Sequence, residues 1–309
     1  MKRNPFVQTM LAGLVLFAVS ATSCKKDSNP TPPAPNTIAK IVNDNASFST
    51  LKAAVAKAGL GDALASGTLT VFAPDNDAFA ASGITAATLD GLTPAQVADI
   101  LKYHVLTTTV TAANVPASDA VVTLQGQKLF ASKNANGVFV NGIKVKTADV
   151  TASNGVIHVI EKVLTPPTQT IKQIAAATPS LSYLVAAVDR AGLLAAIDAP
   201  GKLTVFAPTN QAFIDAGFPT AASITAADQA LITTVVKYHV LPTNVFASDL
   251  INGATTPTLQ GGTLTIGTTP PSVKITTSTK DPSPIVVPDG VNIVATNGVV
   301  HLISKVLLP

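Results

Sequence analysis

Apolar residues near the start of the expected folded region recur every three or four positions. Over residues 47–60 they fall on one face of a helix, with Ser47 as the expected N-cap and Gly59 near the end. The same pattern returns over residues 180–192. Both segments therefore predict amphipathic helices. The apolar face of the first consists of Phe48, Leu51, Val55 and Ala58.

A short strand and another helix are predicted next. Residues 68–73 form an apolar, β-branched run that ends at Pro74, a residue suited to the first turn of a following helix. Farther along, Thr93-Pro94-Ala95-Gln96 has the Thr-x-x-Gln form of a capping box, with proline at the first helical position. We expect a helix from this box to about His104.

Beyond that helix the pattern changes to short β-branched runs. Asn-Gly pairs at residues 153–155 and 296–298 predict tight hairpin turns before a last strand. Because helices come first and strands later, the fold class is α+β with a mostly antiparallel sheet. The expected strands are residues 121–124, 138–140, 143–145 and 156–160.

The chain carries an internal duplication. Three blocks recur in the same order: residues 69–79 as 203–213, 101–106 as 236–241, and 154–158 as 297–301. A period this long indicates two whole domains in tandem, which we place at residues 36–166 and 167–309. The offset grows between the second and third blocks, so the second copy holds an insert. We expect this insert, around Lys280-Asp281-Pro282-Ser283-Pro284, to be a surface loop.

Residues 1–23 have the zones of a secretory signal peptide: a basic start, an apolar run over residues 10–19, and small residues before Cys24. That run is too short to span a bilayer. The segment resembles the lipobox of bacterial lipoproteins, which implies cleavage before Cys24 and acylation of its thiol; an ordinary free thiol is the alternative. The proline-rich residues 24–35 are then an extended linker.

This leader implies a location and a membrane partner. We expect an exported chain, lipid-anchored through Cys24 to the bacterial outer membrane and displayed at the cell surface; an anchor facing the periplasm is the alternative. The chain has 20 Lys and Arg against 17 Asp and Glu, and two of the basic residues, Lys2 and Arg3, leave with the signal peptide. The balanced charge gives no basis for nucleic-acid binding.

The repeated blocks resemble, in order and spacing, the signatures of the fasciclin domain. The first contains Pro74 and Asn76, repeated as Pro208 and Asn210, and the others contain the Tyr-His pair and an Asn-Gly-Val-Ile-His run. The resemblance implies two tandem domains. Each is a wedge of about seven mostly antiparallel strands with N-terminal helices packed on it. It also implies adhesion and matrix binding outside cells, without catalysis.

All four histidines lie in the repeated blocks. His104 follows Val97, Ile100 and Leu101 on the apolar stripe of its helix, and His239 has the same setting. His158 and His301 lie in strands that are apolar on both faces. We interpret the four as buried core residues with hydrogen-bonded rings. A zinc site from His104 and His158 would need a third ligand that the pattern does not supply, so no metal is expected.

The Tyr-His pairs are the candidate binding residues. Tyr103 and His104 end one helix, and Tyr238 and His239 end its counterpart. In fasciclin domains this region has been linked to integrin recognition, so the resemblance implies a binding role for the pair. Packing in the core, with the tyrosine hydroxyl bonded to a carbonyl, is the alternative.

Catalytic patterns are missing from the sequence. Glu161 is the only glutamate, and its counterpart in the second copy is Ser304. Asp119 and Asp249 do match, but each lies in an Ala-Ser-Asp run typical of a turn or cap. Neither a nucleophile elbow nor a phosphate-binding loop is present. We expect a protein that is not an enzyme and needs no cofactor.

Three functions fit these features. The first is an adhesion or binding module displayed on the surface, with an extracellular protein or a polysaccharide as ligand. The alternatives are a glycan-binding accessory lipoprotein for polysaccharide capture and a structural envelope protein that binds a partner on the same cell. Two tandem copies would allow a weak site to be used twice, with a large gain in avidity.

Overall fold

The computed structural model describes residues 35–115, 118–269, 272–276, 282–284 and 290–309. The expected signal peptide, Cys24 and nearly all of the linker lie outside these residues, as do Lys280 and Asp281. Residues 36–309 form one unit. None of the helices in the described part of the chain has the length and apolar character needed to cross a membrane.

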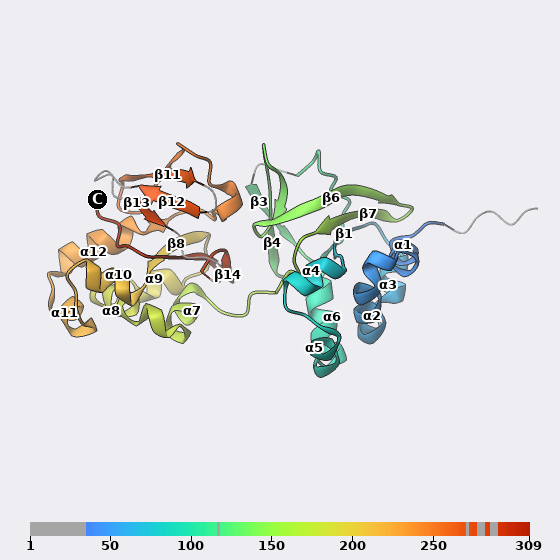
Figure 1. Cartoon of the computed structure of the whole chain (residues 1–309), viewed down its shortest axis with the longest axis horizontal. Helices are drawn as coiled ribbons and strands as arrows, with labels where there is room; N and C mark the ends of the chain where they lie inside the picture. The colour runs from blue at the N-terminus through green and yellow to red at the C-terminus, as the bar shows by residue number, and fades with distance from the viewer. Residues whose placement is uncertain (1–34, 116–117, 270–271, 277–281, 285–289) are drawn as a thin grey trace, which may run out of the picture. The chain divides into compact units, whose positions relative to one another are not determined.

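The first repeat has helices at its N-terminus and a seven-stranded sheet whose first strand, β1, precedes three of the helices (Figure 1). Its helices are α1 Ile38–Asp44, η1 Ala46–Phe48, α2 Ser49–Ala58, α3 Gly61–Ala65, α4 Asn76–Ala81, α5 Ala86–Gly91 and α6 Pro94–Tyr103. Its strands are β1 Leu69–Pro74, β2 Val105–Leu106, β3 Ser118–Val122, β4 Lys128–Asn134, β5 Gly137–Val140, β6 Ile143–Ala152 and β7 Gly155–Ile160.

These strands run in the order β2-β1-β7-β6-β5-β4-β3, and β1 and β7 form the one parallel pair among the pairings described for this sheet. The predicted α+β class with a mostly antiparallel sheet is confirmed.

The second repeat follows the same order of helices and strands up to β9. Its helices are α7 Ile171–Ala177, η2 Pro179–Leu181, α8 Ser182–Arg190, α9 Leu194–Asp198, α10 Asn210–Asp215, α11 Ala221–Ala226, α12 Gln229–Tyr238 and η3 Ala247–Asp249. Its strands are β8 Leu203–Pro208, β9 Val240–Leu241, β10 Thr255–Pro257, β11 Thr263–Thr269, β12 Ser272–Thr276, β13 Pro282–Pro284, β14 Ile293–Ala295 and β15 Gly298–Ile303.

Within the described residues these strands pair as β10-β11-β12-β13 and β14-β15-β8-β9. The loop predicted for the insert is wrong at Pro282–Pro284, because this segment pairs with β12 as strand β13. Proline cannot donate a ladder hydrogen bond, and a strand at the edge of a sheet tolerates that loss.

The predicted helix starts are partly confirmed. The capping box at α6 is present: Gln96 N–H donates to Thr93 Oγ1 at 3.2 Å, and Thr93 N–H donates to Gln96 Oε1 at 2.8 Å. Ser47 as an N-cap is wrong, because Asn45 accepts the bond from Ser47 N–H and a short 3₁₀ turn precedes α2.

The two matching aspartates also differ in structure. Asp119 lies inside strand β3, so its predicted place in a turn is wrong. Asp249 lies in the turn η3, where it accepts a bond from Phe246 N–H at 3.0 Å, as predicted for a cap.

Asparagines of the repeated blocks join helices to strands. The side chain of Asn154, in the turn between β6 and β7, accepts from Ile38 N–H at 2.9 Å and donates to Leu64 O at 3.0 Å. Asn297 makes the equivalent bonds to Ile171 N–H and Ile197 O. The predicted hairpin turns are confirmed at both places. Each Asn-Gly turn therefore also anchors the first helix of its repeat.

Asn76 and Asn210 make a second connection of this kind. Asn76 Oδ1 accepts from Thr50 N–H at 3.1 Å, and its amide donates to Ala46 O at 3.0 Å. Asn210 Oδ1 accepts from Tyr183 N–H at 2.9 Å. These bonds fix the start of α2 against α4 in the first repeat, and the start of α8 against α10 in the second.

Candidate functional site

The tyrosines of the Tyr-His pairs lie inside the fold. The Tyr103 hydroxyl donates to Lys128 O at 3.0 Å and accepts from Asn141 Nδ2 at 2.9 Å. Burial raises the pKa of this phenol to about 12. In the second repeat the Tyr238 hydroxyl donates to Thr263 O at 3.0 Å. Each tyrosine thus ties the end of its helix to the first residue of a sheet strand.

The neighbouring histidines are buried and neutral. Leu164 N–H donates to His104 Nε2 at 2.9 Å, so the ring proton lies on Nδ1, which bonds Ile100 O at 2.8 Å. His239 makes the same two bonds, with Leu307 N–H and Val235 O. Burial lowers the pKa of both imidazoles to about 4, because the charged form would lose its hydration. The two rings therefore hold the chain that follows β7 against α6 and the chain that follows β15 against α12.

The histidines in the strands cross-link the sheet to the segment after β2 or β9. His158 Nε2 bonds Val110 O at 2.8 Å, Asp149 N–H donates to its Nδ1, and its ring stacks on Phe72. His301 bonds Val245 O and Asn292 N–H and stacks on Phe206. Burial lowers the pKa of His301 to about 4.

These contacts place the candidate binding residues plainly. Tyr103, His104, Tyr238 and His239 are at most 2% exposed, so none of them reaches the surface. A direct contact with a partner would require the helix end to open, and the binding role of these pairs stays a prediction. Within the described parts of the chain, no three His, Cys, Asp or Glu side chains gather where they could hold a metal ion.

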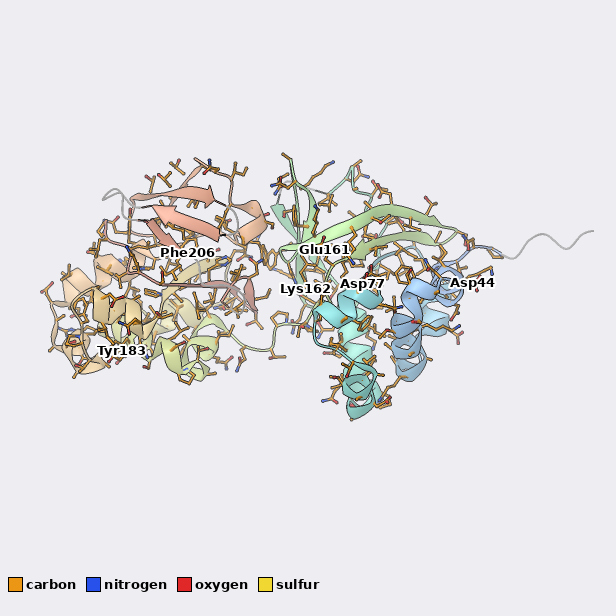
Figure 2. The ribbon with its side chains drawn as sticks, viewed as in Figure 1. Asp44, Asp77, Glu161, Lys162, Tyr183 and Phe206 are labelled. Carbon is orange, nitrogen blue, oxygen red and sulfur yellow. The ribbon has the colours of Figure 1, made fainter. Side chains whose placement is uncertain are left out.

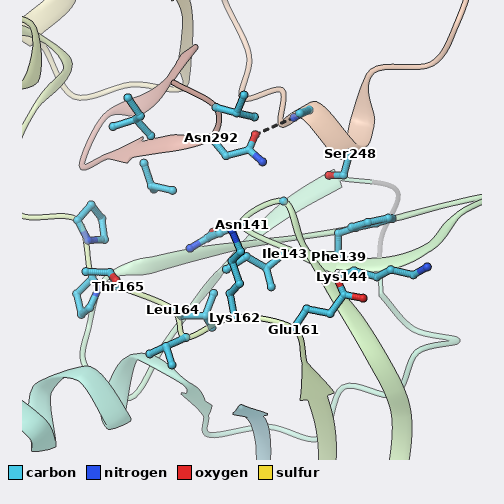
Figure 3. Close-up of a pocket in the computed structure, with 18 of the residues that line it drawn as sticks. Phe139, Asn141, Ile143, Lys144, Glu161, Lys162, Leu164, Thr165, Ser248 and Asn292 are labelled. Atoms are coloured by element: carbon cyan, nitrogen blue, oxygen red, sulfur yellow. Dashed lines mark hydrogen bonds between the residues drawn. The ribbon is translucent and has the colours of Figure 1, made fainter. Parts of the chain in front are cut away.

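A pocket of about 700 Å³ lies where segments of the two repeats meet (Figure 3). Its polar lining includes Asn141, Lys144, Glu161, Lys162 and Ser248. The first four belong to the first repeat and the last to the second. The lysine side chains can donate hydrogen bonds to a ligand, and the glutamate side chain can accept them.

Hydrogen bonds between the repeats border this pocket. Ser132 Oγ donates to Asp249 Oδ1 at 2.6 Å, and Asn134 Nδ2 donates to Ser248 O at 2.7 Å. Within the second repeat, Asn292 Oδ1 accepts from Ala247 N–H at 2.8 Å, as the dashed line in Figure 3 shows. The pocket was not predicted from the sequence, because its residues come from segments of the two repeats that are distant in the chain. The unmatched Glu161 was the one signal that could have pointed to it.

A comparison with protein families gives the identity of both repeats. The model described as the fasciclin domain matches residues 46–166 and 179–309. This chain belongs to the fasciclin domain family. The two tandem fasciclin domains expected from the repeated blocks are confirmed, and the family is associated with cell adhesion and binding.

Several curated relatives carry fasciclin domains similar to these. Transforming growth factor-beta-induced protein ig-h3 of Sus scrofa is 30% identical over 248 residues, covering 79% of this chain and 35% of that protein. Human periostin is 34% identical over 182 residues, covering 59% of this chain and 21% of periostin. The chain thus spans about a third or less of the length of these two relatives.

A bacterial relative and a solved structure complete the comparison. Protein sll1483 of Synechocystis is 46% identical over 136 residues, covering 42% of this chain and 74% of that protein. The solved FAS1 domain pair of the insect cell adhesion molecule fasciclin I aligns over 85% of this chain and 97% of its own, with a TM-score of 0.44 and 19% identity.

Proposed function

We propose that this chain is an exported, lipid-anchored adhesion module. Two fasciclin domains are held at the bacterial cell surface through acylated Cys24 and bind an extracellular protein. The observation that carries this proposal is the tandem match to a family associated with adhesion and binding. The signal peptide and lipobox pattern support the anchor.

The use of the repeated residues supports a scaffold for binding. Asn76, Tyr103, His104, Asn154 and His158 each bond to the backbone of the same repeat. The same holds for their counterparts in the second repeat. The repeated side chains therefore build the fold, and the surfaces between them are left to differ from copy to copy. Such a division suits a binding module whose ligand is set by its surface.

The pocket of Figure 3, with its mixed polar and apolar lining, supports a second candidate, binding of a polysaccharide segment. Its volume of about 700 Å³ lies in the range of small-ligand sites. Its donors and acceptors suit sugar hydroxyls. In this case the ligand would contact residues of both repeats at once.

The test is saturable binding of residues 25–309 to immobilised matrix proteins and polysaccharides. Protein ligands are expected to bind, and the Glu161→Ala variant is expected to bind them unchanged. If polysaccharides alone bind, and Glu161→Ala weakens them, the glycan function replaces the first proposal. Asp44→Ala is a matched control, because Asp44 is an exposed acid on α1 outside the pocket (Figure 2).

The anchor is tested in cells. The Cys24→Ala variant of the full chain is expected to leave the membrane fraction and to remove adhesion of intact cells to a bound ligand. Its purified form is expected to keep the thermal unfolding midpoint of residues 25–309. A Cys24→Ala protein that stays in the membrane pellet would contradict lipid anchoring.

A further inference from the structure

An open groove separates helices α2 and α5 in the first repeat. We call it the α2–α5 groove, and its volume is about 500 Å³. The side chains that matter for its shape are Thr50, Ala53, Lys57, Phe79, Ile84 and Leu89. Phe79, Ile84 and Leu89 also line an adjoining recess of about 130 Å³, which is apolar. The groove therefore has an apolar floor, and the recess in this floor is large enough for a few methyl groups.

The second repeat shows what can fill this space. Tyr183 takes the position of Thr50, since each donates its N–H to the asparagine of the first block, Asn210 or Asn76. The Tyr183 ring lies 6.4 Å from the ring of Phe213, measured between centroids. Phe213 is the counterpart of Phe79. The phenol of the second repeat thus packs against the counterpart of Phe79, at a position where the first repeat has the smaller Thr50.

The Tyr183 hydroxyl completes that arrangement by donating to Pro219 O at 3.0 Å. The ring therefore spans from α8 to the segment before α11. Helices α8 and α11 also approach closely, whereas α2 and α5 do not. Edge and tilted contacts between aromatic rings add to the free energy of burial, and a tyrosine hydroxyl bonds a carbonyl at the rim.

A basic residue ties the two helices together in both repeats. Lys57 Nζ donates to Leu89 O at 2.7 Å and to Asp90 O at 3.0 Å. In the second repeat Arg190 donates twice to Ala227 O. In the first repeat these bonds fix the C-terminal end of α5 against α2. With Thr50 in place of Tyr183, the first repeat keeps a related space between the two helices without an aromatic occupant.

We propose that the α2–α5 groove binds a tyrosine side chain of a partner protein, in the place that Tyr183 takes in the second repeat. This proposal rests on the proposed adhesion function and names its partner's chemistry. Lys57 and Asp90 lie at the rim with opposite charges, so a neutral ring suits the groove better than an ion. Ala53 and Ala80 at the sides of the groove have small side chains, so the extended backbone of a partner can approach it closely.

The direct test uses N-acetyl-tyrosinamide as the probe and the methyl NMR signals of Ile84 and Leu89 in residues 25–309 as the readout. We expect saturable shifts with a dissociation constant of about 1–10 mM, the range for one small ring. Thr50→Tyr, which installs the residue of the second repeat, is expected to weaken this binding about tenfold or more. Thr50→Ser keeps the groove open and is expected to bind as before.

The reciprocal variant Tyr183→Thr opens the second repeat. It is expected to add shifts at Ile224, the counterpart of Leu89, with the same probe. N-acetyl-leucinamide is the matched control and is expected to shift these methyl signals several-fold less. Unchanged shifts at Ile84 and Leu89 up to 50 mM probe, or equal binding by folded Thr50→Tyr, would overturn the proposal. A preserved thermal midpoint shows that Thr50→Tyr is folded.

The ligand panel separates this proposal from the adhesion function on which it rests. If a protein ligand binds and Thr50→Tyr weakens it together with the tyrosine probe, both proposals gain support. If a protein ligand binds equally to Thr50→Tyr, the adhesion function stands and the groove is not its site. If the probe binds but every protein ligand fails, the tyrosine site stands and the adhesion function fails.

Discussion

In the first repeat an open groove lies between α2 and α5, while the space behind α1 is almost filled, with a cavity of about 20 Å³. In the second repeat Tyr183 covers the counterpart of the groove, and a cavity of about 150 Å³ opens behind α7. The cause of the second difference is side-chain size. Val42 and Leu101 of the first repeat correspond to Ala175 and Val236.

Most polar contacts of the repeated blocks, in contrast, are the same in both copies. Asn76, Asn154, His104 and His158 have counterparts that make equivalent bonds. Removing one buried partner leaves another group unsatisfied, at a cost of about 1–3 kcal/mol. Exchanging one methylene costs about 0.8 kcal/mol. The two repeats therefore share most of these buried hydrogen bonds, but they differ in where apolar side chains fill the interior.

Acid should have the largest effect, and it should weaken both repeats. The pKa of His104 in the first repeat, and of His239 and His301 in the second, is lowered by burial from 6.5 to about 4. Between these values the unfolded chain binds protons that the folded chain does not, so the free energy of unfolding decreases as the pH falls from 6.5 to 4. Each such histidine accounts for about 3 kcal/mol at the acid end.

We therefore expect each repeat to unfold at a lower urea concentration at pH 4.5 than at pH 7.5, because each contains at least one such histidine. The NMR signals of each repeat, followed through the urea titration, measure this. The Asp198 pKa is lowered by its bond from Thr170, but that carboxyl acts below pH 3.8, outside this range. A repeat whose urea midpoint does not decrease on acidification would contradict the prediction.

Glycine at the last hairpin should be indispensable in both repeats. A Cβ on Gly155 would lie 1.9 Å from Leu69 O at a φ of +146°, and one on Gly298 would lie 2.1 Å from Leu203 O. We expect Gly155→Ala and Gly298→Ala each to lower the free energy of unfolding of its own repeat by about 4 kcal/mol. Chemical denaturation followed by circular dichroism measures this.

Gly91→Ala is the matched control for these two variants. No atom lies within 4 Å of the added methyl and the backbone is helical, so we expect no loss and a gain of up to about 1 kcal/mol. A Gly155→Ala protein as stable as this control would contradict the prediction. It would show that β1 and β7 can move apart to accommodate the methyl group at little cost in free energy.

Local chemistry could be predicted from the sequence and spatial fit could not. The Thr93 capping box and the Asn-Gly hairpins depend on neighbouring residues, so their patterns identify them. The pairing of Pro282–Pro284 with β12 depends on a distant strand, which outweighs the turn preference of proline. The exchange of Thr50 for Tyr183 is visible once the repeats are aligned, but the groove it leaves depends on the spacing of α2 and α5.

Exchanging side-chain volume between the repeats should exchange their cavities. Val42→Ala removes two methyl groups from the filled space of the first repeat, and we expect it to lower stability by about 2 kcal/mol. Ala175→Val adds them to the cavity of about 150 Å³ in the second repeat and should raise stability by about 1 kcal/mol. Thermal unfolding of both variants tests the sign.

Xenon provides an independent readout of the same exchange. An apolar cavity of about 150 Å³ stays dry and binds xenon or benzene, so xenon should shift the methyl signals of Leu184 and Val188 in the unmodified chain. Ala175→Val should remove those shifts. If Ala175→Val lowers stability instead, the cavity cannot accept the added methyl groups without disturbing the packing of α7.

The smallest expected difference lies at the start of the helix after the first strand. Asp75 caps α4 by accepting from Ala78 N–H at 2.8 Å and also pairs with Lys146 Nζ at 2.9 Å, whereas Thr209 caps α10 alone. The bond with Asp75 raises the pKa of Lys146. Lys146→Met should lower stability by about 0.5 kcal/mol at low salt, and 1 M NaCl should remove the difference. Asp75→Thr, which copies the second repeat, should lose the same amount through the ion pair, because threonine keeps the cap. A loss above 1 kcal/mol for Asp75→Thr would mean that the charge of Asp75 is needed for the cap as well.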